Sequence, residues 1–164
     1  MSELDALTRQ KVNWLNGYPY EIVSRAKQLV ANNELGPYLI KKYPVAHDIR
    51  TDRELYNYAV RLQKEFMHSS PPILSVAYRP MVDPDGWAIY YPLIRDIKVS
   101  PVFRRAPIEF LRLLLLHELG HIEEEGHDEA FYRLHASMVP DYVQLHLDIN
   151  LYMLHLDTGG VLYQ

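Results

Sequence analysis

The sequence contains no cysteine, and this absence excludes two kinds of site at once. Disulfide frameworks and cysteine-ligated zinc sites both need thiols. Any metal must therefore be bound by histidine, aspartate or glutamate, ligands that are more typical of catalytic than of structural zinc. Internal repeats and low-complexity tracts are absent as well, so the 164 residues predict a single domain over residues 1–164.

The chain also lacks long apolar runs. The longest, at residues 87–91 and 113–116, are far shorter than the roughly 20 residues that a membrane helix needs. The opening residues, MSELDALTRQKVNWL, do not show the basic and then apolar pattern of a secretory signal. We therefore expect a cytoplasmic protein that does not bind membranes.

An excess of basic charge is missing too. The chain has 17 Lys and Arg against 21 Asp and Glu, which gives a net charge of −4. Non-specific binding to phosphates needs a basic surface, so nucleic acid is disfavoured as the main partner. Hydrophobic residues make up 48% of the chain and charged residues 23%, which is typical of a globular protein.

The first 70 residues predict a helical N-terminal extension. Apolar residues recur with helical spacing over residues 20–32. Thr51 and Glu54 form a capping-box pattern, which predicts a further helix that runs to about Phe66. The following residues, 71–157, are expected to form the core that carries the chemistry.

This core predicts an α+β fold. Two strand-like runs flank the turn sequence at residues 83–86, which indicates a hairpin or a small, mainly antiparallel sheet, and residues 97–100 predict a further short strand. Three helices should follow: one from Pro107 to a left-handed stop at Gly126, one over 128–138 and one over 140–157. The last of these also shows a strand-like alternation, but its length and its leucines favour a helix.

The sequence His117-Glu118-Leu119-Gly120-His121 carries the strongest chemical signal. Residues four apart lie on one face of a helix, so the two imidazoles can bind one tetrahedral zinc ion. Glu118 lies one residue round the helix, where it can reach a zinc-activated water without binding the metal. This spacing predicts a catalytic zinc centre with Glu118 as the catalytic carboxylate.

Two histidines leave the ligand set incomplete, and two candidates remain for the third position. His127 follows His121 by six residues, and three histidines plus a water form a recognised catalytic set. The rival is Asp141, 20 residues beyond His121, which is also explained as an acid at a helix N-terminus. The spacing favours His127 and leaves Asp141 open.

Other polar residues in this region have simpler explanations. Residues 123–125 are three glutamates and predict a solvated face, and His135 is expected on a helix surface. His146, His155 and Tyr142 are candidates for stabilising an oxyanion, but a structural role is favoured for each.

The whole string of motifs resembles the YgjP-like family of zinc metallopeptidases, which is related to the SprT-like and WLM groups. The matching pieces are IKVSP (97–101), HELGH (117–121), a histidine at 127, AFY (130–132) and PDY (140–142). The resemblance implies a zincin-like fold, zinc bound by His117, His121 and His127, Glu118 as the catalytic carboxylate, and a peptide or protein substrate. Metzincins share this histidine spacing, but Glu124 stands where they have glycine.

We therefore expect a zinc-dependent metallopeptidase, with two alternatives from other classes. The first is a non-catalytic, zincin-like binding or sensing module with a structural zinc, which would work equally well without Glu118. The second is a DNA-associated protease like the SprT-like group, which would show salt-dependent DNA binding.

Overall fold

The computed structural model describes residues 20–67, 70–83, 86–157 and 159–163. Along the chain its elements are α2 (Tyr20–Ala31), α3 (Leu35–Lys42), α4 (Asp52–Phe66), β1 (Ser75–Tyr78), β2 (Ala88–Tyr91), β3 (Asp96–Val99), the 3-10 helix η1 (Pro101–Phe103), α5 (Ile108–Gly120), α6 (Glu129–Met138) and α7 (Tyr142–Asp157). The predicted α+β fold is confirmed, as is the helix predicted over 140–157. The part of the predicted N-terminal extension at residues 1–19 lies outside the described residues.

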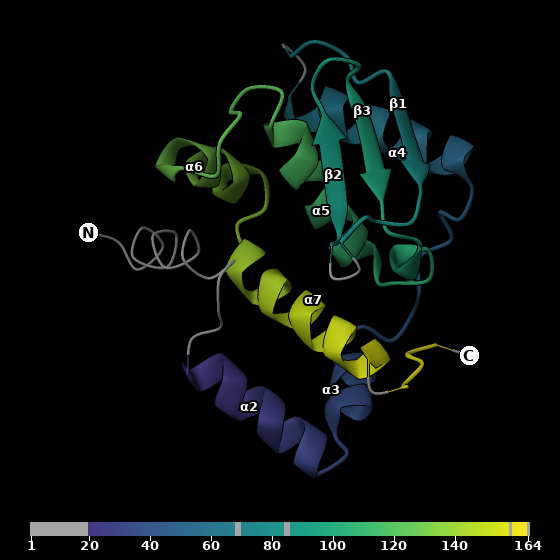
Figure 1. The fold of residues 1–164 in the computed structure, drawn as a ribbon, viewed down its shortest axis with the longest axis vertical. Helices are drawn as coiled ribbons and strands as arrows, with labels where there is room; N and C mark the ends of the chain where they lie inside the picture. Colours follow the sequence, from purple (N-terminus) through teal and green to yellow (C-terminus); the bar gives the residue numbers. More distant parts are fainter. Residues whose placement is uncertain (1–19, 68–69, 84–85, 158, 164) are drawn as a thin grey trace.

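The sheet has three strands in the order β1-β3-β2 and is mixed rather than mainly antiparallel. Strand β1 runs parallel to β3, and β2 runs antiparallel to it. Helices α4 and α5 pack against each other and against the strands, and both lie behind the sheet in Figure 1. The sheet and α4 therefore cover α5, the helix with the HELGH sequence, and keep it buried in the core.

The hairpin predicted across residues 83–86 is wrong. The amide of Gly86 does bond to the carbonyl of Asp83, as in a turn, but β1 and β2 are separated by β3. The antiparallel neighbours are β2 and β3, which the short segment 92–95 joins. Alternation identifies segments that can form strands but not their order in the sheet: β1 and β3 each have three of their four residues buried, yet only β3 is central.

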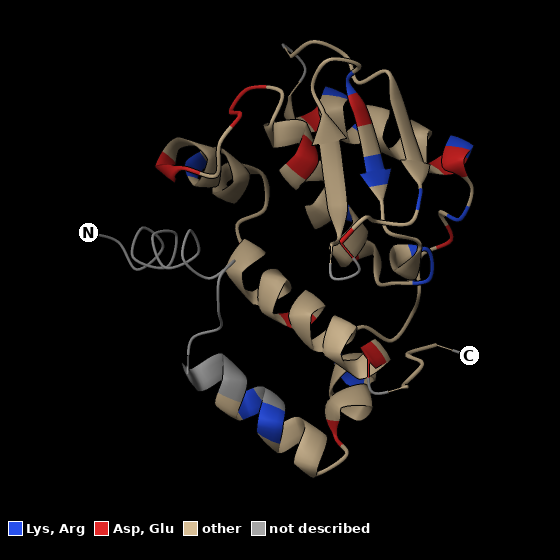
Figure 2. Cartoon of the chain, in the orientation of Figure 1, with Lys and Arg blue, Asp and Glu red and all other residues tan. Residues whose placement is uncertain are grey.

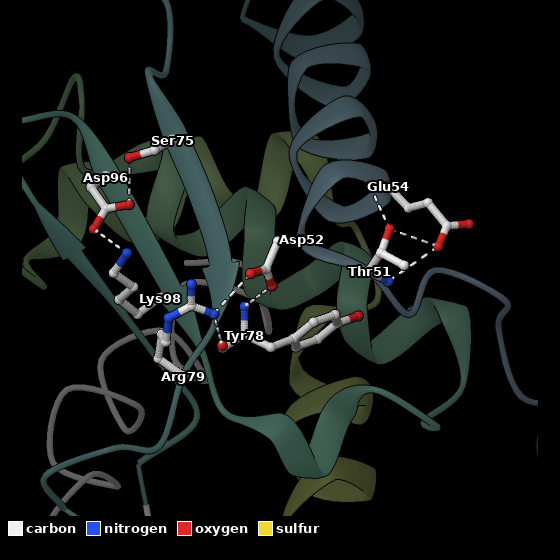
Figure 3. A network of polar contacts seen from close by, with 8 residues as sticks. All are labelled: Thr51, Asp52, Glu54, Ser75, Tyr78, Arg79, Asp96 and Lys98. Atoms are coloured by element: carbon white, nitrogen blue, oxygen red, sulfur yellow. Dashed lines mark hydrogen bonds and ion pairs between the residues drawn. The ribbon is translucent and has the colours of Figure 1, made fainter.

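The capping box predicted at the start of α4 is confirmed, and the same turn ties the helix to the sheet. The Thr51 hydroxyl accepts a hydrogen bond from the amide of Glu54, and the Glu54 carboxylate accepts one from the amide of Thr51. Asp52, the next residue, accepts a hydrogen bond from the amide of Tyr78 in β1 and pairs with Arg79 at 2.8 Å (Figure 3). These contacts attach the start of α4 to the end of β1.

Helix α5 ends at Gly120, six residues before the predicted stop. Gly126 is not in a left-handed conformation, so the predicted cap is wrong. The amides of Glu123 and Glu124 instead bond back to the carbonyl of Gly120 in a closing turn. Negative side chains are unfavourable at the negative end of a helix, which explains why the helix stops before the glutamate run.

Helix α7 crosses the molecule and joins the N-terminal helices to the rest (Figure 1). Its Asp148 is fully buried, where it pairs with Lys42 at 2.7 Å and accepts hydrogen bonds from the hydroxyls of Tyr38 and Tyr43. One apolar core extends from Leu29 in α2 to Leu162 near the C-terminal end. Within the described ranges, no helix combines the length and the apolar character that spanning a bilayer requires.

Candidate metal centre

Helix α5 brings His117, Glu118 and His121 to one place because of its register and its burial. The residues before them are almost all apolar and buried, including Leu113, Leu114, Leu115 and Leu116. A helix that is apolar on nearly every side is typical of a buried position in the core. Its C-terminal end therefore holds a buried Glu118 between two half-buried histidines.

The three predicted ligands converge on one point. Nε2 of His127, on the exposed segment after the helix, lies 3.0 Å from Nε2 of His121 and 3.1 Å from Nε2 of His117. Nitrogens bound at about 2.1 Å to one tetrahedral zinc ion are roughly 3.4 Å apart, so the spacing suits a shared cation. His117, His121 and His127 are hereafter called the open triad.

A backbone contact fixes the orientation of His121. Its Nδ1 lies 2.9 Å from the carbonyl oxygen of Glu124, an atom that can only accept a hydrogen bond. Nδ1 must therefore carry the proton, and the lone pair of Nε2 is free to face Nε2 of His127, which lies 3.0 Å away. Metal-bound histidines are commonly oriented in this way. The turn that ends α5 early is thus the feature that prepares His121 for a metal.

Phe131 packs among the histidines of the open triad. Its ring stacks on His121 at 4.4 Å between centroids and meets His117 and His127 edge-on at 4.8 and 5.2 Å. Phe131 is held by the start of α6, where Asp128 caps the helix by accepting a hydrogen bond from the amide of Phe131. The cap of α6 thereby contributes to the positions of all three ligands.

Glu118 is 8% exposed and faces strand β2. Burial raises the pKa of its carboxyl to about 8, while a hydrogen bond from the amide of Tyr90 in β2 favours the charged form. Strand β2 is an edge strand, so Glu118 lies where α5 packs against the edge of the sheet. A carboxylate with this pKa can both accept and return a proton near neutral pH.

Asp141, the rival third ligand, is exposed in the turn before α7. Among the described residues it belongs to neither group of side chains that could share a metal ion. The geometry therefore brings His127, and not Asp141, together with the two histidines of α5.

His135 is not on a helix surface as predicted but fully buried, because α6 turns this side of the helix toward α5 and α7. The centroid of its ring lies 5.2 Å from that of His117, and the ring centroid of His146 in α7 lies 6.1 Å from that of His117. Burial, and to a smaller extent these neighbouring histidines, lower the pKa of His117 well below its usual value. His135 follows Phe131 by four residues, and this helical spacing on an apolar face is the signal that sequence reasoning missed.

Acidic residues lie along the segment that joins α5 to α6, which runs between His121 and His127 of the open triad (Figure 2). Glu123 and Glu125 in this segment are exposed, as predicted for a solvated face, and Glu124 is half-buried. The surface beside the open triad is therefore negatively charged where this segment lies.

Three comparisons with known proteins bear on this arrangement. A family described as "YgjP-like, metallopeptidase domain" matches residues 81–151, the stretch with the histidines, Glu118 and β2. A protein of Escherichia coli (strain K12) named "UTP pyrophosphatase" is 34% identical over 160 residues, covering 90% of this chain and 96% of the relative. No solved structure matches the chain. The family description and the histidine groups together indicate a site for a divalent metal.

Proposed function

We propose, from the premise that this chain belongs to the YgjP-like metallopeptidase family, that it is a zinc-dependent hydrolase with Glu118 as the general base. The observation that carries the proposal is the convergence of three histidine Nε2 atoms, at 3.0 and 3.1 Å, beside a buried carboxylate. A zinc ion bound by such a set lowers the pKa of a coordinated water towards neutrality and polarises the bond to be cleaved.

The residues of the chain divide the remaining work. His117, His121 and His127 would hold the metal, and the bond from His121 to the Glu124 carbonyl keeps one ligand in the binding tautomer. Glu118 takes a proton from the attacking water and returns it to the leaving group. The amide of Tyr90 holds the carboxylate in place, so that its position is set by strand β2 rather than by solvent.

The first candidate for the substrate is UTP, cleaved at a phosphoanhydride bond to release pyrophosphate. Its support is the alignment with a relative named UTP pyrophosphatase, which covers 90% of this chain and therefore includes much of the segment before the family match. A triphosphate would approach the acidic segment after α5 as a complex with a divalent cation, which offsets the repulsion.

The second candidate is a peptide bond, the substrate that the sequence predicted. It is favoured by the family description and by the edge position of β2, which contacts Glu118. An extended chain can add to such an edge as a further strand and lie beside the catalytic carboxylate. The exposed side chains Ile89 and Tyr91 of β2 offer apolar contacts to it.

One pair of assays separates the two candidates. Purified, zinc-loaded protein is incubated with UTP, and UMP and pyrophosphate are quantified; a parallel sample receives a mixture of unstructured peptides, and the products are identified by mass spectrometry. Release of pyrophosphate that Glu118→Gln abolishes supports the first candidate, and peptide cleavage with the same dependence supports the second. If neither substrate is turned over, a binding or sensing module with a structural zinc becomes the better proposal.

The DNA-associated alternative has its own test. It requires DNA binding that weakens steeply with salt, because the affinity would come from phosphate contacts. The net charge of −4 and the acidic segment beside the open triad make this outcome unexpected.

A further inference from the structure

A second group of histidines lies directly behind the open triad. His117, His135 and His146 each offer a ring nitrogen, and these nitrogens lie within 4.8 Å of one another. His135 is 0% and His146 6% exposed, in contrast to the exposed His127. The three come from α5, α6 and α7, so the tertiary fold assembles them. They are hereafter called the buried triad.

The two triads share His117, and the two nitrogens of its ring have different surroundings. Nε2 lies 3.1 Å from Nε2 of His127 in the open triad. Nδ1 is buried and has no hydrogen-bond partner among the described residues. A metal-bound imidazole usually donates its second N–H to a carbonyl or carboxylate, as His121 does to Glu124. His117 departs from this rule, so its Nδ1 is available to bind a second ligand.

We propose that the buried triad binds a second divalent cation, so that the two triads form a two-metal centre bridged by His117. Nε2 of His117 serves the cation of the open triad, and Nδ1 serves the cation of the buried triad. The Nδ1–H bond breaks when the second cation binds, its proton leaves to solvent, and the ring becomes an imidazolate. Zinc is the probe of choice because imidazole nitrogens bind it well.

Aromatic side chains enclose the buried triad. Trp87 lies 5.4 Å from His146 between ring centroids, Tyr142 lies 5.1 Å from His135, and Phe131 lies 5.9 Å from His135. Such packing limits the rotamers of the histidines and excludes bulk water, as a preorganised metal site requires. The buried cation would thus be held for charge and structure, while the open triad keeps a position for substrate.

Metal content measures the proposal directly. The full chain is stripped with a chelator, saturated with zinc, freed of excess by gel filtration and analysed by elemental mass spectrometry. We expect about two zinc ions per wild-type chain and about one in either His135→Gln or His146→Gln, which change separate helices. His127→Ala should also retain about one, bound by the buried triad.

A matched control is His155→Gln, which lies on α7 like His146 but about 14 Å further along the helix axis. This variant should bind as much zinc as the wild type, and circular dichroism should show that every variant is folded. One zinc per wild-type chain at saturation would overturn the proposal. So would retention of the second zinc in both His135→Gln and His146→Gln, because that ion would then be bound elsewhere. Neither result depends on which bond the enzyme hydrolyses.

Discussion

The open triad and the buried triad share one histidine but differ in what surrounds them. The open triad ends in the exposed His127 and borders the acidic segment after α5. The buried triad is closed by three helices and by aromatic rings. A catalytic metal needs a coordination position that substrate or water can reach, and a structural one does not. Under the proposed function, hydrolysis would therefore take place at the open triad, and exposure rather than the number of histidines distinguishes the two triads.

Removing the shared residue should have the largest effect. His117→Ala deletes a ligand from both triads, so we expect near-complete loss of bound zinc and a fall in activity of roughly 10³-fold or more, since the metal-activated water is lost. Elemental analysis and hydrolysis of UTP or peptide measure the two losses. Zinc at the wild-type level in this variant would show that neither triad is a metal site.

Changing the carboxylate separates chemistry from binding. Glu118→Gln keeps the shape of the side chain but removes its ability to take a proton, so activity should fall by about 10²- to 10⁴-fold. Zinc content should not change, because Glu118 is a ligand in neither triad. Hydrolysis at the wild-type rate would exclude Glu118 as the general base.

Removing the exposed ligand should affect the open triad alone. We expect His127→Ala to lower zinc affinity there by more than the 10- to 100-fold that is typical for loss of an outer-shell partner. The matched variant Asp141→Ala should bind zinc like the wild type, since Asp141 lies outside both triads. Isothermal titration with zinc compares the two, and the opposite order of affinities would make Asp141 the third ligand.

The sequence predicted the parts of the centre that depend on local spacing. His117 and His121 are neighbours because any helix places residues four apart on one face, and the Thr51 capping box depends on three residues only. The α+β class followed from the same periodicities. These features need no knowledge of how distant segments pack.

The features that sequence missed depend on tertiary contacts. Strand β3 pairs with both β1 and β2, an order that no single strand encodes. The burial of His135 follows from the packing of α6 against α5, and its polar side chain suggested the opposite. The early end of α5 reflects the closing turn at Gly120 rather than the glycine at position 126. The buried triad could not be predicted because its members come from three helices.

A smaller effect should distinguish the triads by their dependence on the start of α6. Asp128→Ala removes the N-cap that holds the amide of Phe131, at a cost of about 1 kcal/mol in the free energy of unfolding. This corresponds to a fall in Tm of roughly 2–4 °C. Because Phe131 packs on the ligands of the open triad, zinc affinity there should weaken more than in the buried triad. Equal weakening at both triads would mean that the cap acts through overall stability.

The smallest effect concerns His47, a histidine outside both triads. It tests whether burial of a histidine is enough to make the stability of the protein depend on pH. His47 accepts a hydrogen bond from the amide of Ile49 through Nδ1 and donates one through Nε2 to the carbonyl of Phe103. Burial lowers its pKa, so the folded protein keeps it neutral at a pH where the unfolded chain takes up a proton. Its contribution to stability is therefore complete above pH 6.5, the usual pKa, and declines as the pH falls below that value.

We expect metal-free wild-type protein to lose more stability between pH 7 and pH 5 than metal-free His47→Gln, as measured by urea unfolding. An equal loss would attribute the acid sensitivity of the metal-free protein to the histidines of the triads instead.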